Sequence, residues 1–255
     1  PIPPRMVSAK DAPCKENILH GKDVDITKLP VPTWTVGEDP APFFTSPYLI
    51  TKDPETGVRN VGTYRMQVKG PNKTGLLIGK RQDMAWHMYK NNDKNQPTPV
   101  AVVIGADPSI GYVSVSKMSD ALDEFAVAGA LRGQAVDMVA CETVPLEVPA
   151  TAEIVLEGEI PPNAFEHEGP FGESTGYASG RSTRNVIKVK AITHRKDAYY
   201  EDLISGNSYE HLWLMGVPKQ AIVFERMKQV IPNVKQMYWP VSGVNLLCFV
   251  QLAEP

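Results

Sequence analysis

The stretch EHEGPFGESTGY, residues 166–177, carries two carboxylates at a short spacing. Glu168 and Glu173 are separated by Gly-Pro-Phe-Gly, and this composition is typical of a tight, stiff turn rather than a helix or strand. A stiff turn can hold two carboxyl groups at a fixed separation, which general acid–base catalysis requires. The alternative is a solvated acidic loop, which the spacing alone favours. Phe171 shifts the balance slightly toward a turn that is anchored to the core.

Arg65 is a second candidate, because it lies in the alternating apolar segment NVGTYRMQV. Tyr64, Met66 and Val68 recur at period two, so we expect one strand here. A guanidinium among apolar neighbours usually has a carboxylate partner; the alternative is an edge strand whose arginine faces water. Asn60 and Arg65 are an odd number of positions apart and would face opposite sides of a regular strand. For both to reach one site, Asn60 must precede the strand or a bulge must intervene.

A carboxylate also borders the apolar face of a helix expected over SDALDEFAVAGALRG. Ser119 is the expected N-cap and Gly133 the expected stop. The apolar stripe consists of Ala121, Phe125 and Ala128. Glu124 lies beside that stripe and requires a cation, which can be a metal ion or an ion-pair partner. The sequence leaves these two alternatives equally open.

Asp83 and His87 are four residues apart on a helix expected over RQDMAWHMYKNN, so they share a face. Such a pair can bind a metal, yet isolated acid–histidine pairs on helices are more often surface contacts. The other four of the five histidines show no ligand spacing.

Composition excludes several classes of protein. The chain has 255 residues, of which 42% are hydrophobic and 22% charged, with a formal net charge of -3, so nucleic acid is not the expected partner. No apolar run approaches the roughly 20 residues that a membrane-spanning helix needs, and the polar, proline-rich N-terminus is no signal peptide. Three scattered cysteines argue against a disulfide framework and indicate a cytoplasmic protein.

The elements that must position these residues fall into three segments. Residues 1–50 are rich in proline and predict an extended arm over a core, and both chain ends look like cuts in a longer protein. Further strands are expected at 75–79, 99–105, 152–160 and 186–192. The last two alternate apolar and charged residues and predict antiparallel strands with one face in the core, Lys188 and Lys190 facing water. From residue 207 a helical block and a strand begin a second, unfinished unit.

Three segments of the chain, in their order, closely resemble the UbiD family of prenylated-flavin-dependent (de)carboxylases. They are NVGTYR, CETVPLEVPATAEIVLEGEI and EGPFGE, and the resemblance covers roughly residues 25–250. The resemblance implies an α+β fold, with a split β-barrel flavin-binding domain followed by the start of an α/β domain. The expected boundaries are an arm at 1–50, the catalytic domain at 51–206 and a truncated C-terminal domain at 207–255.

The resemblance also implies prenylated FMN and a divalent metal, manganese or magnesium, with potassium as a further candidate ion. Its metal ligands would be Asn60, Glu124 and, where relatives often have a histidine, Asp83, with His87 one turn away as the alternative. Aspartate is an acceptable hard-oxygen ligand for either metal. The expected cofactor contacts are Asn60, Thr63, Arg65, Gln82 and Glu124.

The catalytic set implied by the resemblance is Arg65, Glu168 and Glu173. Glu173 would donate the proton that replaces CO2, and the other two would orient it and set its pKa. The expected activity is that of a carboxy-lyase: reversible, non-oxidative decarboxylation of an aromatic or α,β-unsaturated carboxylic acid. The alternatives are an FMN-dependent reductase on a related split barrel and a non-catalytic subunit of a carboxylase complex. Expected partners are a flavin prenyltransferase that supplies the cofactor and further subunits, in a homo-oligomer or a larger complex.

Overall fold

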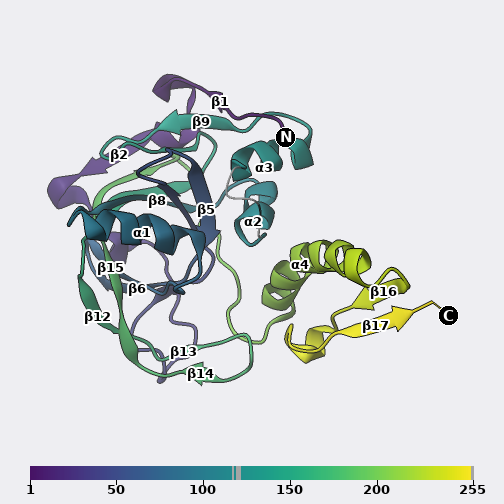
Figure 1. Cartoon of the computed structure of the whole chain (residues 1–255). Helices are drawn as coiled ribbons and strands as arrows, with labels where there is room; N and C mark the ends of the chain where they lie inside the picture. The colour runs from purple at the N-terminus through teal and green to yellow at the C-terminus, as the bar shows by residue number, and fades with distance from the viewer. Residues whose placement is uncertain (117, 119–121, 254–255) are drawn as a thin grey trace.

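The computed structural model describes residues 1–116, 118 and 122–253 (Figure 1). Its α-helices are α1 (Asp83–Asp93), α2 (Pro108–Ser114), α3 (Glu124–Arg132) and α4 (Tyr209–Val230). Its strands are β1 (Arg5–Met6), β2 (Asn17–His20), β3 (Phe43–Phe44), β4 (Tyr48–Lys52), β5 (Arg59–Thr63), β6 (Met66–Gly70), β7 (Lys73–Leu76), β8 (Thr98–Ile104), β9 (Asp137–Ala140), β10 (Glu147–Pro149), β11 (Ile154–Ile160), β12 (Phe165–Glu168), β13 (Phe171–Gly172), β14 (Ala178–Ser179), β15 (Ser182–His194), β16 (Val234–Tyr238) and β17 (Phe249–Leu252). None of the helices in these ranges is long and apolar enough to cross a membrane.

A ten-stranded sheet forms the centre of the molecule, in the order β3-β6-β7-β15-β11-β8-β4-β5, with β2 and β12 also paired to β15. The strand pairs of this sheet are antiparallel, which confirms the mixed α+β class. Lys188 and Lys190 on β15 are exposed, as their alternation predicts. At the β11 bulge a Cβ on Gly158 would lie 2.2 Å from the Lys188 carbonyl oxygen, so only glycine fits.

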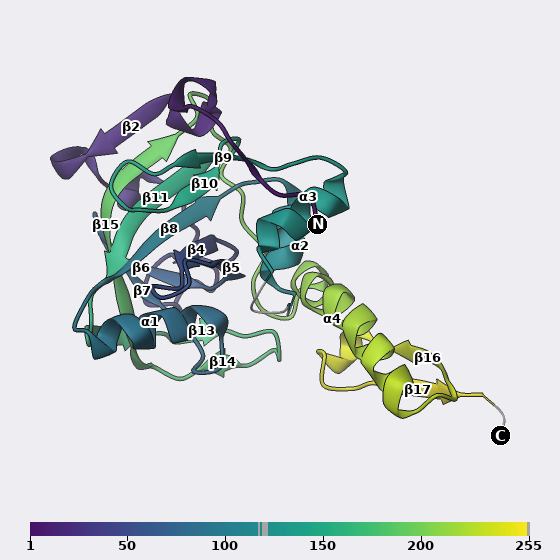
Figure 2. The ribbon, with the colours of Figure 1, turned by 45° about the horizontal axis from the view of Figure 1, so that its top comes forward.

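The sheet has a core on each side, so the expectation that β11 has only one face in the core is wrong. Val155 packs with Ile110 of α2 and Phe125 of α3 in one cluster, and Leu156 packs with Met84 of α1 in the other. Figure 2 shows α1 and the α2–α3 pair beside different parts of the sheet. Even the charged side of β11 is covered by other elements.

The predicted strand over residues 60–68 is two strands. Tyr64 and Arg65 lie between them, and β5 pairs with β4 whereas β6 pairs with β3 and β7. The chain therefore changes neighbours at Arg65, which removes the facing conflict between Asn60 and Arg65. Tyr64 lies in the break yet fits the apolar alternation with Met66 and Val68, so this alternation did not reveal it.

The helix expected from Ser119 begins instead at Glu124, with Asp123 as its N-cap; Ser119 lies outside the described residues. The Asp123 side chain accepts a hydrogen bond from the Phe125 amide. The helix ends at Gly133, whose positive φ of 74° suits a glycine C-cap as predicted.

The N-terminal segment contributes strands to the ten-stranded sheet and one strand to a three-stranded sheet. β1 pairs in parallel with β9 in a small sheet that also contains β10, and β2 pairs with β15. The expected boundary at residue 50 falls inside β4. At the other end, α4, β16 and β17 form a separate lobe beside α2 (Figures 1 and 2).

Candidate functional site

Arg65 reaches the acidic turn from the break between β5 and β6. Its Nε lies 3.1 Å from Oε1 of Glu168 and its Nη2 lies 3.0 Å from Oε2, so the pair is bidentate. Its Nη1 donates to Oε1 of Glu173. Nη2 also donates to the Ser179 hydroxyl at 3.2 Å. The structure thus brings together the three side chains that the resemblance singled out.

The acidic turn is held by strand pairing on both sides. β12 ends at Glu168, the Gly169–Pro170 peptide is cis, and β13 then pairs with β14. Residues 171–172 are therefore a short strand, where a turn without strand was expected. The Gly169 amide donates to the side-chain oxygen of Gln67 at 3.3 Å, which attaches the turn to β6.

Two phenylalanines enclose the guanidinium of Arg65. Phe171 is buried, as expected, and its ring centroid lies 4.5 Å from that of Phe43. The Arg65 Cζ atom lies 4.8 Å from the centre of the Phe171 ring and 6.0 Å from that of Phe43. Stacking on aromatic faces fixes the plane of a guanidinium and shields its ion pairs from water.

The two carboxylates occupy different environments. The Glu168 side chain is 0% exposed and both its oxygens accept from Arg65. The Glu173 side chain is 38% exposed and shares only one oxygen with Arg65. The two carboxylates therefore differ in solvent access and in the number of bonds that they share with Arg65. Of the two, Glu173 is the one that a ligand can reach.

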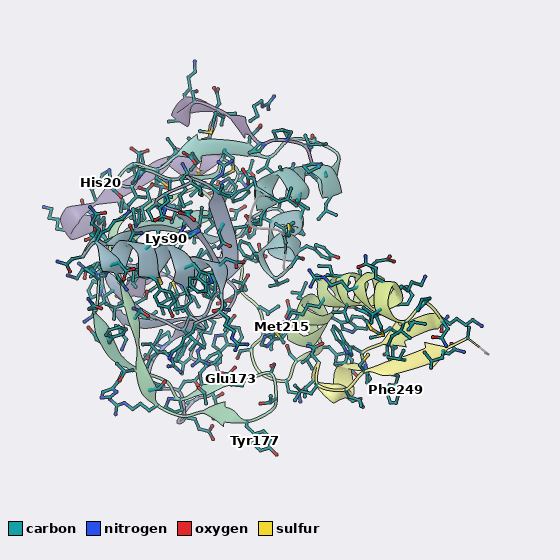
Figure 3. All side chains as sticks on the ribbon, in the orientation of Figure 1. His20, Lys90, Glu173, Tyr177, Met215 and Phe249 are labelled. Carbon is teal, nitrogen blue, oxygen red and sulfur yellow. The ribbon has the colours of Figure 1, made fainter. Side chains whose placement is uncertain are left out.

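A cavity of about 660 Å³ lies beside these residues. Its lining includes Thr63, Tyr64, Arg65, Gln82 and Glu173, together with residues of α2, of the segment 201–205 and of the first turns of α4. Figure 3 labels Glu173 and Met215 at the junction between the sheet and α4, and both line the cavity. Its volume is in the range of pockets that bind small molecules and cofactors.

Three of the expected cofactor contacts line this cavity, namely Arg65, Thr63 and Gln82. The Thr63 hydroxyl lies 2.7 Å from that of Ser114 on α2. Gln82 is the residue before α1, and its side-chain oxygen accepts from the Gly79 amide at 2.5 Å. Both side chains border the cavity, so each lies where a ligand in it can be contacted.

A second cavity, of about 490 Å³, contains the expected metal ligands Asn60, Asp83 and Glu124 in its wall. The Asn60 Nδ2 and Glu124 Oε2 atoms are buried and have no hydrogen-bond partner. Burial raises the pKa of the Glu124 carboxyl to about 7, with smaller contributions from the Asp123 and Asp83 charges. In the described residues no group of three or more histidine, cysteine, aspartate or glutamate side chains could hold a metal; the expected set contains one amide and two carboxylates. A buried carboxylate oxygen without a partner, Oε2 of Glu124, fits a site for an oxygen-preferring cation.

His87, the alternative third ligand, lines the same cavity. Its Nδ1 lies 2.8 Å from the Thr51 hydroxyl, and burial lowers its pKa, which favours the neutral ring that a metal requires. The structure therefore leaves the choice between Asp83 and His87 open.

Sequence reasoning missed Gln67 and Ser179, which contact the acidic turn and Arg65. No spacing signal links either residue to the motif, because both contacts depend on how the strands pair.

The comparisons with known proteins cover the whole chain. The family model UbiD, described as 3-octaprenyl-4-hydroxybenzoate carboxy-lyase Rift-related domain, matches residues 5–208. The UbiD-class enzyme HmfF of Pelotomaculum thermopropionicum, in an evolved dimeric form with prFMN, is 37% identical with a TM-score of 0.95, over 100% of this chain and 59% of that one. Apo 3,4-dihydroxybenzoic acid decarboxylase (AroY) of Klebsiella pneumoniae is 30% identical with a TM-score of 0.91, over 100% and 55%.

Vanillic acid decarboxylase (ShVdcCD) of Sedimentibacter hydroxybenzoicus, in its closed form, is 31% identical with a TM-score of 0.91, over 99% of this chain and 54% of that one. The chain thus spans a little more than half the length of these three proteins.

Proposed function

The chain belongs to the UbiD family, and from that premise we propose that it carries the flavin-binding and catalytic part of a carboxy-lyase. Its substrate would be an aromatic or α,β-unsaturated carboxylic acid, gaining or losing CO2 without oxidation. The observation that carries the proposal is the ion network of Arg65, Glu168 and Glu173 at the wall of the 660 Å³ cavity. A buried guanidinium that binds two carboxylates of unequal exposure is suited to proton transfer, because the buried acid holds the guanidinium in place and the exposed acid can reach a ligand.

Prenylated FMN would occupy that cavity, in contact with Thr63 and Gln82 on the sheet side. When bound, this cofactor supplies the electron sink for breaking or forming the carbon–carbon bond. In the decarboxylation direction the Glu173 carboxyl gives its proton to the substrate carbon that has lost CO2. Arg65 then stabilises the Glu173 carboxylate that remains, and Glu168 fixes the plane of the guanidinium. Solvent returns the proton to Glu173 through its exposed side, and carboxylation runs the same steps in reverse.

Asn60, Glu124 and either Asp83 or His87 would hold a divalent metal, manganese or magnesium. The buried Glu124 Oε2, an acceptor without a hydrogen-bond partner, supports this site, since a cation would satisfy it. The metal would bind the cofactor phosphate beside α1 and add positive charge there. The proposal also includes potassium as a further bound ion and a flavin prenyltransferase as the enzyme that supplies the cofactor.

We further propose that the ten-stranded sheet is a split β-barrel. The order in which β15 pairs with β7, β11, β12 and β2 supports this, since so many partners require a strongly bent strand. The evolved dimeric form of HmfF and the name ShVdcCD support the proposal that this chain assembles with further subunits.

The first test is the identity of the bound cofactor. The chain, produced together with a flavin prenyltransferase, should release prenylated FMN, which differs from plain FMN in mass and absorbance. Plain FMN alone, together with hydride transfer from a nicotinamide, would instead support the reductase alternative.

The second test is the proton donor. Glu173→Gln should lower turnover by about 10²- to 10⁴-fold, the usual contribution of a positioned general acid, and leave cofactor binding intact. The control is Glu166→Gln, because Glu166 lies on β12 and pairs with Lys73 away from Arg65. CO2 release from 3,4-dihydroxybenzoic and vanillic acids measures the effect. Equal activity in the two variants would remove Glu173 from the mechanism.

A further inference from the structure

Arg59, the residue before Asn60 on β5, connects three elements through one guanidinium. Its Nε lies 3.2 Å from Oδ2 of Asp123, to which Nη2 also donates. Its Nη1 lies 3.2 Å from Oε2 of Glu147 on β10. Its Cζ atom is 5.7 Å from the centre of the Phe125 ring on α3. The side chain is only 14% exposed, so these contacts are largely shielded from water.

Asp123 has two roles at the start of α3. Its Oδ1 accepts from the Phe125 amide at 2.9 Å, which makes it the N-cap, and its Oδ2 binds Arg59. The carboxylate that begins the helix is therefore also attached to β5. Glu147 is in turn fixed by Lys52 on β4, at 2.6 Å from Nζ to Oε1.

The residues that follow Arg59 and Asp123 in the sequence are both expected metal ligands. Asn60 follows Arg59 on β5, and Glu124 follows Asp123 as the first residue of α3. Arg59 also lines the 490 Å³ cavity, so its guanidinium lies beside the expected ligands while it binds Asp123 and Glu147. Asn60 and Glu124 line the 490 Å³ cavity, each with a buried polar atom that lacks a partner.

We propose that Arg59 is a positioning residue for the metal site. By holding Asp123 and Phe125 against β5, it fixes the first turn of α3 so that the Glu124 carboxylate and the Asn60 amide can bind one cation. This inference rests on the proposed function, because it assumes that Asn60 and Glu124 are ligands. Partners of metal ligands typically change metal affinity by about 10- to 100-fold when they are lost.

Positioning and simple electrostatics predict opposite results for the loss of Arg59. Removal of a positive charge beside Asp123 makes the surroundings of the cavity more negative, so Coulomb attraction alone would tighten cation binding. Loss of positioning would weaken it, because the first turn of α3 would no longer be tied to β5. The sign of the change therefore separates the two effects.

The experiment titrates the 255-residue chain with Mn²⁺ in the presence of FMN and follows free Mn²⁺ by its EPR signal. Arg59→Met should weaken Mn²⁺ binding by about tenfold or more. Asp123→Asn keeps a good N-cap but loses the ion pair, and it should weaken binding in the same direction. Arg195→Met is the control, because Arg195 forms a comparable pair with Glu153, 2.8 Å apart, between other elements. Thermal unfolding of each variant confirms that the protein measured is folded.

Unchanged or tighter Mn²⁺ binding by folded Arg59→Met would overturn the inference. Failure of the proposed function gives a different result: the unchanged chain would then bind no Mn²⁺ with FMN, or Glu124→Gln would bind it as well as the unchanged chain. If Arg195→Met weakened binding as much as Arg59→Met, the effect would be a general loss of stability, and the inference would equally fail.

Discussion

Glu168 and Glu173 carry the same functional group in different surroundings. Glu168 has no exposed surface and both its oxygens bind Arg65, whereas Glu173 borders a cavity. The motif predicts which residues meet, because its residue types match those of a known family. It does not predict Ser179 or Gln67, which support the same network from other strands. Such contacts follow from strand pairing, which no local spacing encodes.

Gly75 on β7 provides a test of how exactly Glu168 must be placed. A Cβ at this position would lie 3.2 Å from the Glu168 Cγ and 3.0 Å from the Lys69 Cε. Gly75→Ala should therefore displace the Glu168 carboxylate by a few tenths of an ångström and turn the Arg65 guanidinium with it. Since misplacement by 1 Å can cost about 10²-fold in rate, we expect a loss of about tenfold in turnover with cofactor binding retained.

The matched control for this substitution is Gly180→Ala, close to the same network. A Cβ on Gly180 has no atom within 4 Å, so this variant should turn over at the normal rate. Steady-state rates of CO2 release measure both variants, and similar rates for the two would show that Glu168 tolerates displacement.

Among the elements, the sequence predicts regular strands and helices well and their interruptions poorly. The helix at α1 and the strand at β8 lie where periodicity places them. The break at Tyr64–Arg65 was not predicted, because Tyr64 fits the apolar alternation with Met66 and Val68 of β6. The start of α3 is set by Asp123, whose carboxylate both caps the helix and binds Arg59. An N-cap that also has a tertiary partner is fixed more firmly than capping alone would fix it.

Strand β11 contains a buried charge that attaches the N-terminal segment to the sheet. Glu157 is fully buried and accepts from Lys15 at 3.1 Å, from the amides of Glu142 and Thr143, and from the Thr143 hydroxyl. Glu157→Ala should cost about 3 kcal/mol in the free energy of unfolding, because it removes one of the two carboxylate partners of buried Lys15 and the acceptor of two amides. Glu157→Gln keeps an acceptor for the amides and should cost less. Urea unfolding gives both values, from the midpoint and slope of the transition.

Glu159 offers a control two residues along the same strand. It pairs with Lys190 at 2.5 Å, but both side chains are partly exposed, so Glu159→Ala should cost less than about 1 kcal/mol. Equal losses for the alanine variants at 157 and 159 would mean that the buried pair contributes no more than a surface pair.

At the scale of the whole molecule, the two lobes differ in how their apolar surface is covered. The strands around β8, β11 and β15 are packed on both faces by the two core clusters. In the other lobe, α4 buries only Leu212, Gly216 and Pro218. The sequence predicts a change of pattern near residue 207, and α4 begins at Tyr209. It does not predict that the first turns of α4 form a wall of the 660 Å³ cavity, because that depends on the path of residues 201–205.

This difference in burial predicts unequal local stability. β16 and β17 pair only with each other among the described strands, and a two-stranded sheet is marginally stable in water. β17 is exposed along its whole length, and several large apolar side chains of α4 face outward. Amides of β16, β17 and the second half of α4 should therefore exchange with deuterium by local opening, well before the global unfolding that releases the central strands. Hydrogen-exchange mass spectrometry measures this, with α1 as the matched helix because it packs Met84 and Met88 on the sheet. Protection in the second half of α4 equal to that of α1 would contradict this prediction and would require stabilising contacts for the lobe that its burial does not provide.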